Sequence, residues 1–264
     1  MKESYDKIGP TAKLVAYLRT FTDIPFAKEI AVESGAKKTF QELAAASAKS
    51  MVRLAPLWEA RYKVTDRILV ENDMTQVLEI AAGLSPRGLS MTENSNIVYV
   101  VTDLPQILEE EKKIAETILA KSNSRRLNLH FQVANVLDMK SLSTAAAAFK
   151  HNKPLAIISE GLFPYLNRAE KKVFADNVHE LLRKYHGLWI ASDVHTKQHL
   201  QEISRLDLDT QTRLTNISNS TERTIENNIF DDEDDIKRYF GAAGFTMEEY
   251  LHSSVFENYP RSNS

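Results

Sequence analysis

The first third of the chain carries apolar residues at the spacing of an amphipathic helix. After Pro10 they recur at i, i+3, i+4 and i+7, which predicts a helix that begins near this proline. The residues of this stripe are Leu14, Tyr17, Leu18 and Phe21. The run Thr39–Glu42 has the form of a capping box and predicts the start of a second helix. Because nothing in this region alternates with a period of two, we expect a helical N-terminal cap over residues 1–70.

After Asp73 the pattern changes to short apolar runs that alternate with amphipathic helices. The runs that we predict as strands are Gln76–Ile80, Ile97–Val101, Leu127–Val133, Leu155–Ile158 and Leu188–Ala191. Two further short strands are expected around Phe245–Tyr250 and Ser254–Glu257. Parallel strands joined by helices need right-handed crossovers, so residues 71–264 are predicted to form an α/β core with a doubly wound, mostly parallel sheet.

Polar residues mark the helix boundaries of this core and one interruption of it. Asn167–Glu170 has the form of a second capping box, and Pro105 suits the first turn of a helix. The stretch Thr196–Asn227 is polar and too long for an ordinary connection. Because it follows the fifth predicted strand directly, we expect a lid insertion there that closes over a substrate.

Composition narrows the classes of protein to which the chain can belong. It has 264 residues, of which 43% are hydrophobic, and a formal net charge of −3. That balance argues against a nucleic-acid scaffold or a polybasic membrane binder, because both need clustered positive charge. The absence of cysteine excludes disulfides, thiolate catalysis and cysteine-ligated metal centres. With no leader-like N-terminus and no apolar run of about 20 residues, we expect a cytoplasmic protein.

Acidic side chains lie at the carboxyl ends of several of the predicted strands or just after them. They are Glu79, Asp103, Asp138, Glu160 and Asp193. In an open α/β sheet, ligands bind beyond the carboxyl ends of the strands, so we expect these acids around one crevice. Gly83 and Asp103 lie 20 positions apart. At that spacing a small-residue turn typically approaches a nucleoside cofactor, and the acid takes its ribose hydroxyls.

The turn after the first predicted strand, Ala81–Gly88, departs from the G-x-G-x-x-G pattern of dinucleotide sites. Ala81 and Pro86 stand at the first and third glycine positions, and Pro86 has no N–H to offer a pyrophosphate. This pattern disfavours an NAD-dependent oxidoreductase, which remains an alternative, and favours a nucleoside cofactor without phosphates. S-adenosyl-L-methionine is the common cofactor of that kind.

Four segments carry the strand ends and the turns that follow them. They are Val77–Arg87, Val100–Pro105, Ala134–Asp138 and Ser159–Leu166. In this order they resemble the leucine carboxyl methyltransferase family, which includes bacterial polyketide O-methyltransferases of the tetracenomycin type. The resemblance implies a Rossmann-like class I methyltransferase fold with a seven-stranded sheet and a helical N-terminal cap. It also implies an S-adenosylmethionine-dependent O-methyltransferase that acts on a carboxylate or hydroxyl of a small molecule or a C-terminal peptide.

The resemblance also implies roles for residues around the cofactor. Arg61 looks like the family's cap arginine, which pairs with the methionine carboxylate of the cofactor. Ala81 and Gly83 would lie beside the methionine part. Asp103 would hold the ribose, and Glu160 would face the cofactor after the fourth strand.

At the adenine end, the resemblance implies contacts from Asn135 and Val136. Glu79 and Leu104 complete the expected set of cofactor-binding residues. The chain departs from the family pattern at three positions, with Ala81 where glycine is usual and with Ser85 and Asn135 where aspartate is usual. Asn135 can both donate and accept hydrogen bonds, so a contact with adenine survives the change.

Methyl transfer from a sulfonium needs neither a nucleophilic side chain nor a metal ion from the protein. The methyl group is already activated, so a carboxylate acceptor needs no base, whereas a hydroxyl acceptor would use one, for which His195 is the candidate. His195 and His199 have the i, i+4 spacing of a metal pair, but the zincin glutamate and a third ligand are missing, so no metal is expected. A protein of the same fold that binds the cofactor without transferring the methyl group is a further alternative.

Overall fold

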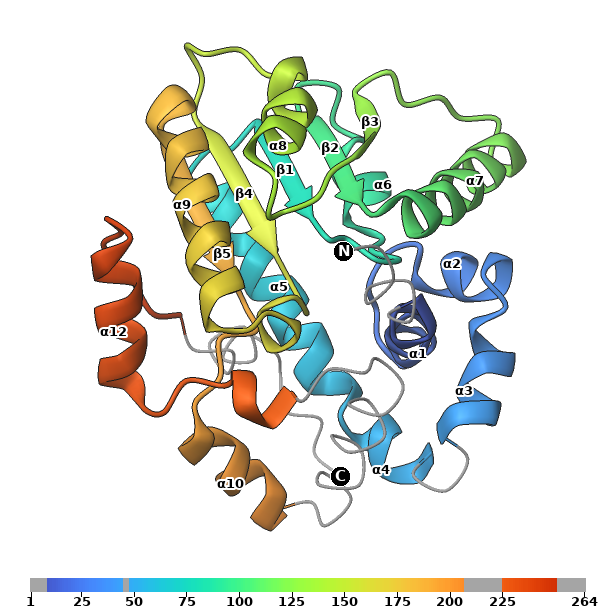
Figure 1. Ribbon diagram of the computed structural model, residues 1–264. Coiled ribbons are helices and arrows are strands. Elements are labelled where there is room, and N and C mark those ends of the chain that lie inside the picture. The colour runs from blue at the N-terminus through green and yellow to red at the C-terminus, as the bar shows by residue number, and fades with distance from the viewer. Residues whose placement is uncertain (1–8, 45–47, 207–224, 251–264) are drawn as a thin grey trace.

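The sheet is five-stranded within residues 9–44, 48–206 and 225–250, which the computed structural model describes (Figure 1). Its strands are β1 (Gln76–Ile80), β2 (Val98–Asp103), β3 (Leu129–Val133), β4 (Leu155–Ser159) and β5 (Gly187–Ala191). All neighbouring pairs are parallel, and the spatial order is β3-β2-β1-β4-β5. The expected α/β class with a parallel sheet is confirmed.

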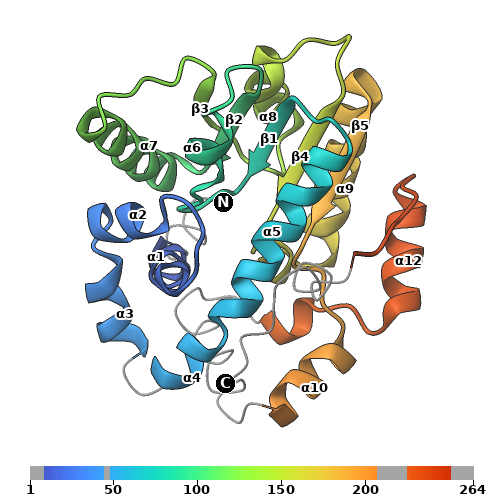
Figure 2. The same ribbon diagram turned by 180° about the vertical axis from the view of Figure 1, so that it is seen from behind.

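Helices cover both faces of the sheet, because side chains along each strand alternate between the faces. The helices that precede or follow the strands are α5 (Ala55–Glu71), α6 (Arg87–Met91), α7 (Pro105–Lys121), α8 (Met139–Ala145), α9 (Arg168–Tyr185) and α12 (Glu233–Ala242). Leu78 and Ile80 of β1 pack with α8 and α9, whereas Val77 packs with α5 and α7. Figures 1 and 2 show α9 and α5 on opposite faces of the sheet. The sheet is therefore doubly wound.

Short helices precede the sheet and lie beyond the arrowheads of β1 and β2 (Figure 1). They are α1 (Gly9–Leu18), the 3-10 turn η1 (Arg19–Phe21), α2 (Ala27–Glu33), α3 (Ala36–Ala44) and α4 (Ala48–Arg53). Ala16 of α1 and Ile30 of α2 belong to a buried cluster with Leu84, in the turn after β1, and with Ile114 of α7. These helices are thereby brought to the carboxyl ends of the strands.

The predicted helix start at Thr39 is wrong. Helix α3 begins at Ala36, so Thr39 lies inside it. Gly35 sets the boundary instead, because its φ of 66° ends α2 and turns the chain. Its C=O then accepts hydrogen bonds from the N–H groups of Lys38 and Thr39. A left-handed glycine therefore replaces the side-chain cap at this boundary.

The expected seven strands are corrected to five within the described residues. Phe245–Tyr250 is irregular and does not pair with the sheet. Its chain continues from the end of α12, where the Phe245 N–H donates to the Phe240 C=O, and the Phe245 ring packs 5.3 Å from the Trp189 ring. Phe245 and Tyr250 pack against buried clusters through single side chains, whereas the residues between them are exposed and form no strand. The other expected strand, Ser254–Glu257, lies outside the described residues.

The predicted lid insertion, Thr196–Asn227, begins with helix α10 (Lys197–Leu206). Residues 207–224 of this stretch lie outside the described part of the chain. The remaining short elements are the 3-10 turns η3 (Ala146–Ala148), η4 (Phe163–Tyr165) and η5 (Ile225–Asn228). Among the helices in the described ranges, none has both the length and the apolar surface needed to cross a bilayer.

Candidate functional site

The candidate site lies where β1 and β4 run side by side. From β1 the chain passes to α6 and β2, and from β4 it passes to α9 on the opposite face, so this is a topological switch point. Ligand crevices form at such points in open α/β sheets. Gly161, which follows β4 with a φ of 74°, borders open space, because an added Cβ would meet no atom of the described residues within 4 Å.

Asp103, at the end of β2, holds the turn that follows β1. Its carboxylate accepts hydrogen bonds from the Gly83 N–H at 2.8 Å and from the Leu104 N–H at 2.7 Å. Burial raises the pKa of Asp103 to about 6, although the two N–H donors oppose the rise. The pair expected from the spacing of 20 residues is thus in direct contact.

Ala81 in the same turn carries backbone strain. Its φ is 51°, in the left-handed region that costs an L-residue about 1–2 kcal/mol. We therefore expect Ala81→Gly to raise the free energy of unfolding by about 0.5–1 kcal/mol, after allowing for the greater freedom of glycine in the unfolded chain. Urea unfolding measures the change.

The matched control for this prediction is Ala82→Gly. Ala82 does not have a positive φ, so the same substitution there should lower the free energy of unfolding by about 0.5–1 kcal/mol. Equal changes at the two positions would show that the backbone at Ala81 is unstrained.

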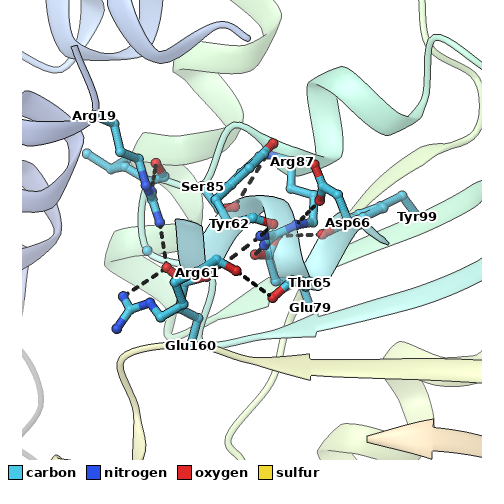
Figure 3. A network of polar contacts seen from close by, with 12 residues as sticks. Arg19, Arg61, Tyr62, Thr65, Asp66, Glu79, Ser85, Arg87, Tyr99 and Glu160 are labelled. Carbon is cyan, nitrogen blue, oxygen red and sulfur yellow. Dashed lines mark hydrogen bonds and ion pairs between the residues drawn. The ribbon is translucent and has the colours of Figure 1, made fainter. Parts of the chain in front are cut away.

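Two arginines from the N-terminal helices converge on Glu160 (Figure 3). Glu160 Oε1 accepts hydrogen bonds from Arg61 Nη2 at 2.9 Å and from Arg19 Nη2 at 3.1 Å. All three side chains are buried or nearly so. Burial raises the pKa of Glu160, but the guanidiniums of Arg61, Arg19 and Arg87 outweigh it and hold the pKa well below its ordinary value. The residue is therefore a carboxylate at neutral pH.

A third arginine, Arg87, lies deeper and is completely buried. Its Nε donates to Asp66 at 2.8 Å and its Nη1 to Glu79 at 3.1 Å, while Tyr99 donates its hydroxyl to the other Glu79 oxygen at 2.8 Å. Arg87 Nη2 also lies 3.7 Å from Glu160 Oε2, which joins the two groups of contacts. We refer to Arg19, Arg61, Arg87, Asp66, Glu79 and Glu160 as the arginine–carboxylate cluster. Glu79, expected at the cofactor, is thus engaged inside this cluster.

The residues expected at adenine follow β3. The side-chain oxygen of Asn135 accepts a hydrogen bond from the Leu137 N–H at 2.9 Å, and the Asn135 N–H donates to the Ser141 hydroxyl at 3.1 Å. The C=O of Val136 accepts from the Asn177 side chain at 2.9 Å. The structure therefore joins Gly83 with Asp103 and Arg61 with Glu160, whereas Asn135 shapes its own turn.

His195 lies between β5 and α10. Its ring centroid is 5.5 Å from that of His199, and its C=O accepts a hydrogen bond from the Phe230 N–H at 3.2 Å. Its role as a base stays a prediction. In the part of the chain that the structure describes, no three ligand-type side chains are grouped to hold a metal ion.

Two further residues shape the site: Asp193, which the sequence analysis places among the strand-end acids, and Arg19, which no sequence pattern indicates. The Asp193 carboxylate accepts hydrogen bonds from the N–H groups of Leu162 and Phe163, at 2.5 and 2.7 Å, and so fixes the turn that follows Glu160. Burial raises the pKa of Asp193 to about 6, against the opposing charge of Arg61. Its place among the strand-end acids was a usable signal. Arg19 gives none, because an arginine beside an apolar stripe is ordinary in an amphipathic helix.

Comparison with protein families gives one match that covers most of the chain. The model described as leucine carboxyl methyltransferase matches residues 16–179. The matched range holds Arg61, the turn after β1, Asp103 and Glu160. The resemblance inferred from the four sequence segments is confirmed.

Curated relatives and a solved structure agree with this match. A protein of Mycobacteroides abscessus, provisionally assigned as an S-adenosyl-L-methionine-dependent methyltransferase, is 25% identical over 190 residues, covering 66% of this chain and 60% of the relative. A similarly assigned protein of Mycobacterium tuberculosis is 31% identical over 97 residues, 37% of this chain and 30% of the relative. The matched part of the chain thus spans less than two thirds of either relative. A crystal structure of a provisionally assigned methyltransferase from Thermobifida fusca YX shares the fold, with a TM-score of 0.50 at 17% identity over 87% of this chain and 79% of that one.

Proposed function

Because the chain belongs to the leucine carboxyl methyltransferase family, we propose that it is an S-adenosylmethionine-dependent O-methyltransferase. The acceptor in this proposal is a carboxylate or hydroxyl of a small molecule or of a peptide C-terminus. The observation that carries it is the pairing of Asp103 with Gly83 and of Arg61 with Glu160 on the two sides of one switch point. A buried carboxylate on one side and a charged pair on the other suit a ligand that joins a ribose to an amino acid.

The side chains present fit the amino-acid end of S-adenosylmethionine. That end carries a carboxylate, for which Arg61 and Arg19 offer guanidiniums, and an ammonium, for which Glu160 offers a carboxylate. The buried Nε of Arg61 has no hydrogen-bond partner among the described residues, which leaves it as a donor for the ligand carboxylate. In the proposal, Asp103 accepts from the ribose hydroxyls with the lone pairs that Gly83 and Leu104 leave open, and Asn135 and Val136 contact adenine.

The chain's own part in the reaction is orientation and the exclusion of water. When bound, the cofactor supplies an activated methyl group, so no nucleophilic side chain is needed. Arg19 reaches both the Leu84 C=O, at 3.1 Å, and Glu160, and so ties the N-terminal helices to both sides of the switch point. Helix α1 lies against the same turn, where a Cβ on Gly83 would be 3.3 Å from the Ala12 Cβ. These contacts shield the site.

The chemical class of the acceptor decides whether the reaction needs a base. A carboxylate acceptor is nucleophilic at neutral pH and needs no base. For a hydroxyl acceptor, His195 is our candidate to take the proton. We also propose that the lid insertion over residues 196–227 covers the acceptor. We further propose that the chain divides into a cap over residues 1–70 and a core over residues 71–264.

A binding and transfer experiment tests this function. Calorimetry should show that the full chain binds S-adenosylmethionine and S-adenosylhomocysteine but not NAD. Transfer of a labelled methyl group to a panel of carboxylic acids and phenols then identifies the acceptor, since methyl esters release methanol in mild base and methyl ethers do not. Binding without transfer to any acceptor would favour the non-transferring alternative. No binding of either cofactor form would refute the proposal.

Asp103 gives the proposal a pH signature. Ribose hydroxyls donate to an ionised carboxylate more strongly than to the neutral acid, so the affinity for S-adenosylmethionine should be full above pH 6. It should fall by about tenfold per pH unit as the pH drops below about 6, where Asp103 takes up a proton. Asp103→Asn should weaken binding by about 10- to 150-fold at pH 7.5 and remove this pH dependence. Calorimetry between pH 5 and 8 measures both effects.

The stability of the fold should follow pH in the opposite direction at this residue. A carboxyl whose pKa is raised from 3.8 to about 6 favours the folded state when it is neutral. Its stabilising contribution is present below pH 3.8 and is lost as the pH rises through about 6.

An affinity for S-adenosylmethionine that stays constant between pH 5 and 8 in the wild-type chain would contradict the prediction that Asp103 binds the ribose.

A further inference from the structure

Trp58 packs its ring against the guanidinium of Arg61, three residues further along α5. The Arg61 Cζ lies 4.4 Å from the centroid of the Trp58 ring. Side chains three positions apart lie on the same face of a helix, so α5 itself brings the two together. A guanidinium is attracted to the face of a tryptophan ring, and the attraction grows as water is excluded. The Arg61 side chain is only 11% exposed, so the contact is made largely out of water.

The other surroundings of Trp58 are apolar and come from the N-terminal helices. Its ring packs on a buried cluster formed by Leu18 of α1, Phe40 of α3 and Met51 of α4. Its indole N–H is buried and has no hydrogen-bond partner among the described residues. A hydrogen bond therefore does not account for a tryptophan at this position, whereas its contact with Arg61 does, because tryptophan is the aromatic residue that attracts a cation most strongly.

A second stacked arginine, Arg87, shows the difference between Arg61 and a purely structural guanidinium. The Arg87 Cζ lies 4.1 Å from the centroid of the Tyr62 ring (Figure 3). All three of its guanidinium nitrogens donate to acceptors within the protein. Arg61 donates its Nη2 to Glu160 at 2.9 Å, but its buried Nε has no partner in the part of the chain that the structure describes. The stacked Arg61 thus keeps a donor that the described protein does not use.

We propose that Trp58 is a positioning residue for the methionine end of the cofactor, which it sets by holding the Arg61 guanidinium against its ring. The inference rests on the proposed function for the identity of the ligand, S-adenosylmethionine. Trp58 fixes the plane of the guanidinium and Glu160 fixes its rotation within that plane, so Arg61 Nε is held in one orientation. A side chain that adopts its binding orientation for only part of the time binds more weakly in proportion.

Two substitutions separate the aromatic face of Trp58 from its apolar bulk. Trp58→Phe keeps an aromatic ring, whereas Trp58→Leu keeps an apolar side chain and removes the ring. Tyr17→Leu is the matched control, because Tyr17 packs on the same cluster, against the rings of Phe21 and Phe40. Among the described residues, no arginine lies over the Tyr17 ring. Circular dichroism establishes that each variant folds.

Calorimetry with two ligands gives the first readout. 5′-Methylthioadenosine carries the adenine and the ribose of S-adenosylmethionine but lacks the amino-acid group. We expect Trp58→Leu to weaken the binding of S-adenosylmethionine about tenfold and to leave that of 5′-methylthioadenosine within about twofold of the wild type. Trp58→Phe should weaken the binding of S-adenosylmethionine by at most about threefold, and Tyr17→Leu should change neither affinity by more than about twofold. A general loosening of the N-terminal helices would not give a loss confined to one ligand.

A double-mutant cycle shows whether the effect of Trp58 passes through Arg61. Arg61→Met removes the guanidinium and should itself weaken the binding of S-adenosylmethionine. Adding Trp58→Leu to Arg61→Met should then weaken binding by less than about a further twofold. A tenfold loss in both backgrounds would overturn the inference. Equal losses for the two ligands, or wild-type affinity in Trp58→Leu, would overturn it as well.

Nuclear magnetic resonance of the Arg61 side chain gives a readout that needs no ligand. A proton above an aromatic face is shifted upfield, so the Arg61 Nε–H signal, identified by its absence from Arg61→Lys, should lie upfield of its ordinary position. It should return to that position in Trp58→Leu. An unshifted signal in the wild-type chain would overturn the inference even if Trp58→Leu does not fold. If the signal is shifted but the wild-type chain binds no S-adenosylmethionine, the proposed function fails while the hold of Trp58 on Arg61 stands.

Discussion

Arg87→Met is expected to lower the free energy of unfolding by about 3–5 kcal/mol, the largest stability loss among the substitutions considered. Arg87 is completely buried, and Glu79, which it neutralises, is only 2% exposed. Without the guanidinium, Glu79 keeps the hydrogen bond that the Tyr99 hydroxyl donates, but it loses the positively charged group whose Nη1 lies 3.1 Å from its Oε1. Urea unfolding followed by circular dichroism measures the loss.

The control for this prediction is Arg183→Met on the exposed side of α9. Arg183 pairs with Glu180 at 3.0 Å, but its side chain is 68% exposed. Such a pair contributes about 0–1 kcal/mol, so the control should scarcely change stability. The double variant Glu79→Gln with Arg87→Met should regain part of the loss, because it leaves no unpaired charge at Glu79. A loss for Arg87→Met no larger than for the control would show that Glu79 is neutral in the fold.

Glu160→Gln is expected to weaken the binding of S-adenosylmethionine about 100-fold, about 2.8 kcal/mol at neutral pH. The change removes the proposed partner of the ligand ammonium. It also removes the carboxylate that holds Arg61 and Arg19 at 2.9 and 3.1 Å, where they would meet the ligand carboxylate. A hydrogen bond to a charged group contributes about 1.5–3 kcal/mol, which sets the size of the effect. Calorimetry at constant pH checks it.

A truncated ligand supplies the control for Glu160. 5′-Methylthioadenosine carries the adenine and the ribose but not the amino-acid group, so its affinity should be unchanged in Glu160→Gln and reduced in Asp103→Asn. Equal losses for the truncated and the full ligand in Glu160→Gln would mean that the substitution disturbs the whole site. In that case Glu160 would have no direct part in recognising the methionine end.

The features that follow from neighbouring residues were predicted well from the sequence. The capping box at Asn167–Glu170 is confirmed. The Glu170 N–H donates to the Asn167 side chain at 3.0 Å, and the Asn167 N–H donates to the Glu170 side chain at 2.9 Å. Pro105 opens α7 as expected. The placement of Gly83 and Asp103 at one edge of the sheet also followed, because β1 and β2 are parallel, but the hydrogen bond between the two residues was not predicted.

Contacts between distant segments could not be predicted in this way. Arg19 and Glu160 are 141 positions apart, and the sequence pattern around Arg19 is that of any amphipathic helix. Glu111 lies on a helix among other acids, and only the packing of α7 beneath the turn shows that it is buried. Even the local pattern at Thr39 failed, because the left-handed Gly35 begins the helix earlier.

The arginine–carboxylate cluster has a consequence for how this chain can change over evolutionary time. Its three guanidiniums and three carboxylates cancel only as a set, and a mutation that neutralises one member leaves a buried charge of the other sign. Drift at these positions should therefore proceed by compensated pairs, so that homologues lacking the acid at position 79 also lack the base at position 87. An alignment of homologues in which the two positions vary independently would show that the cluster tolerates a net charge.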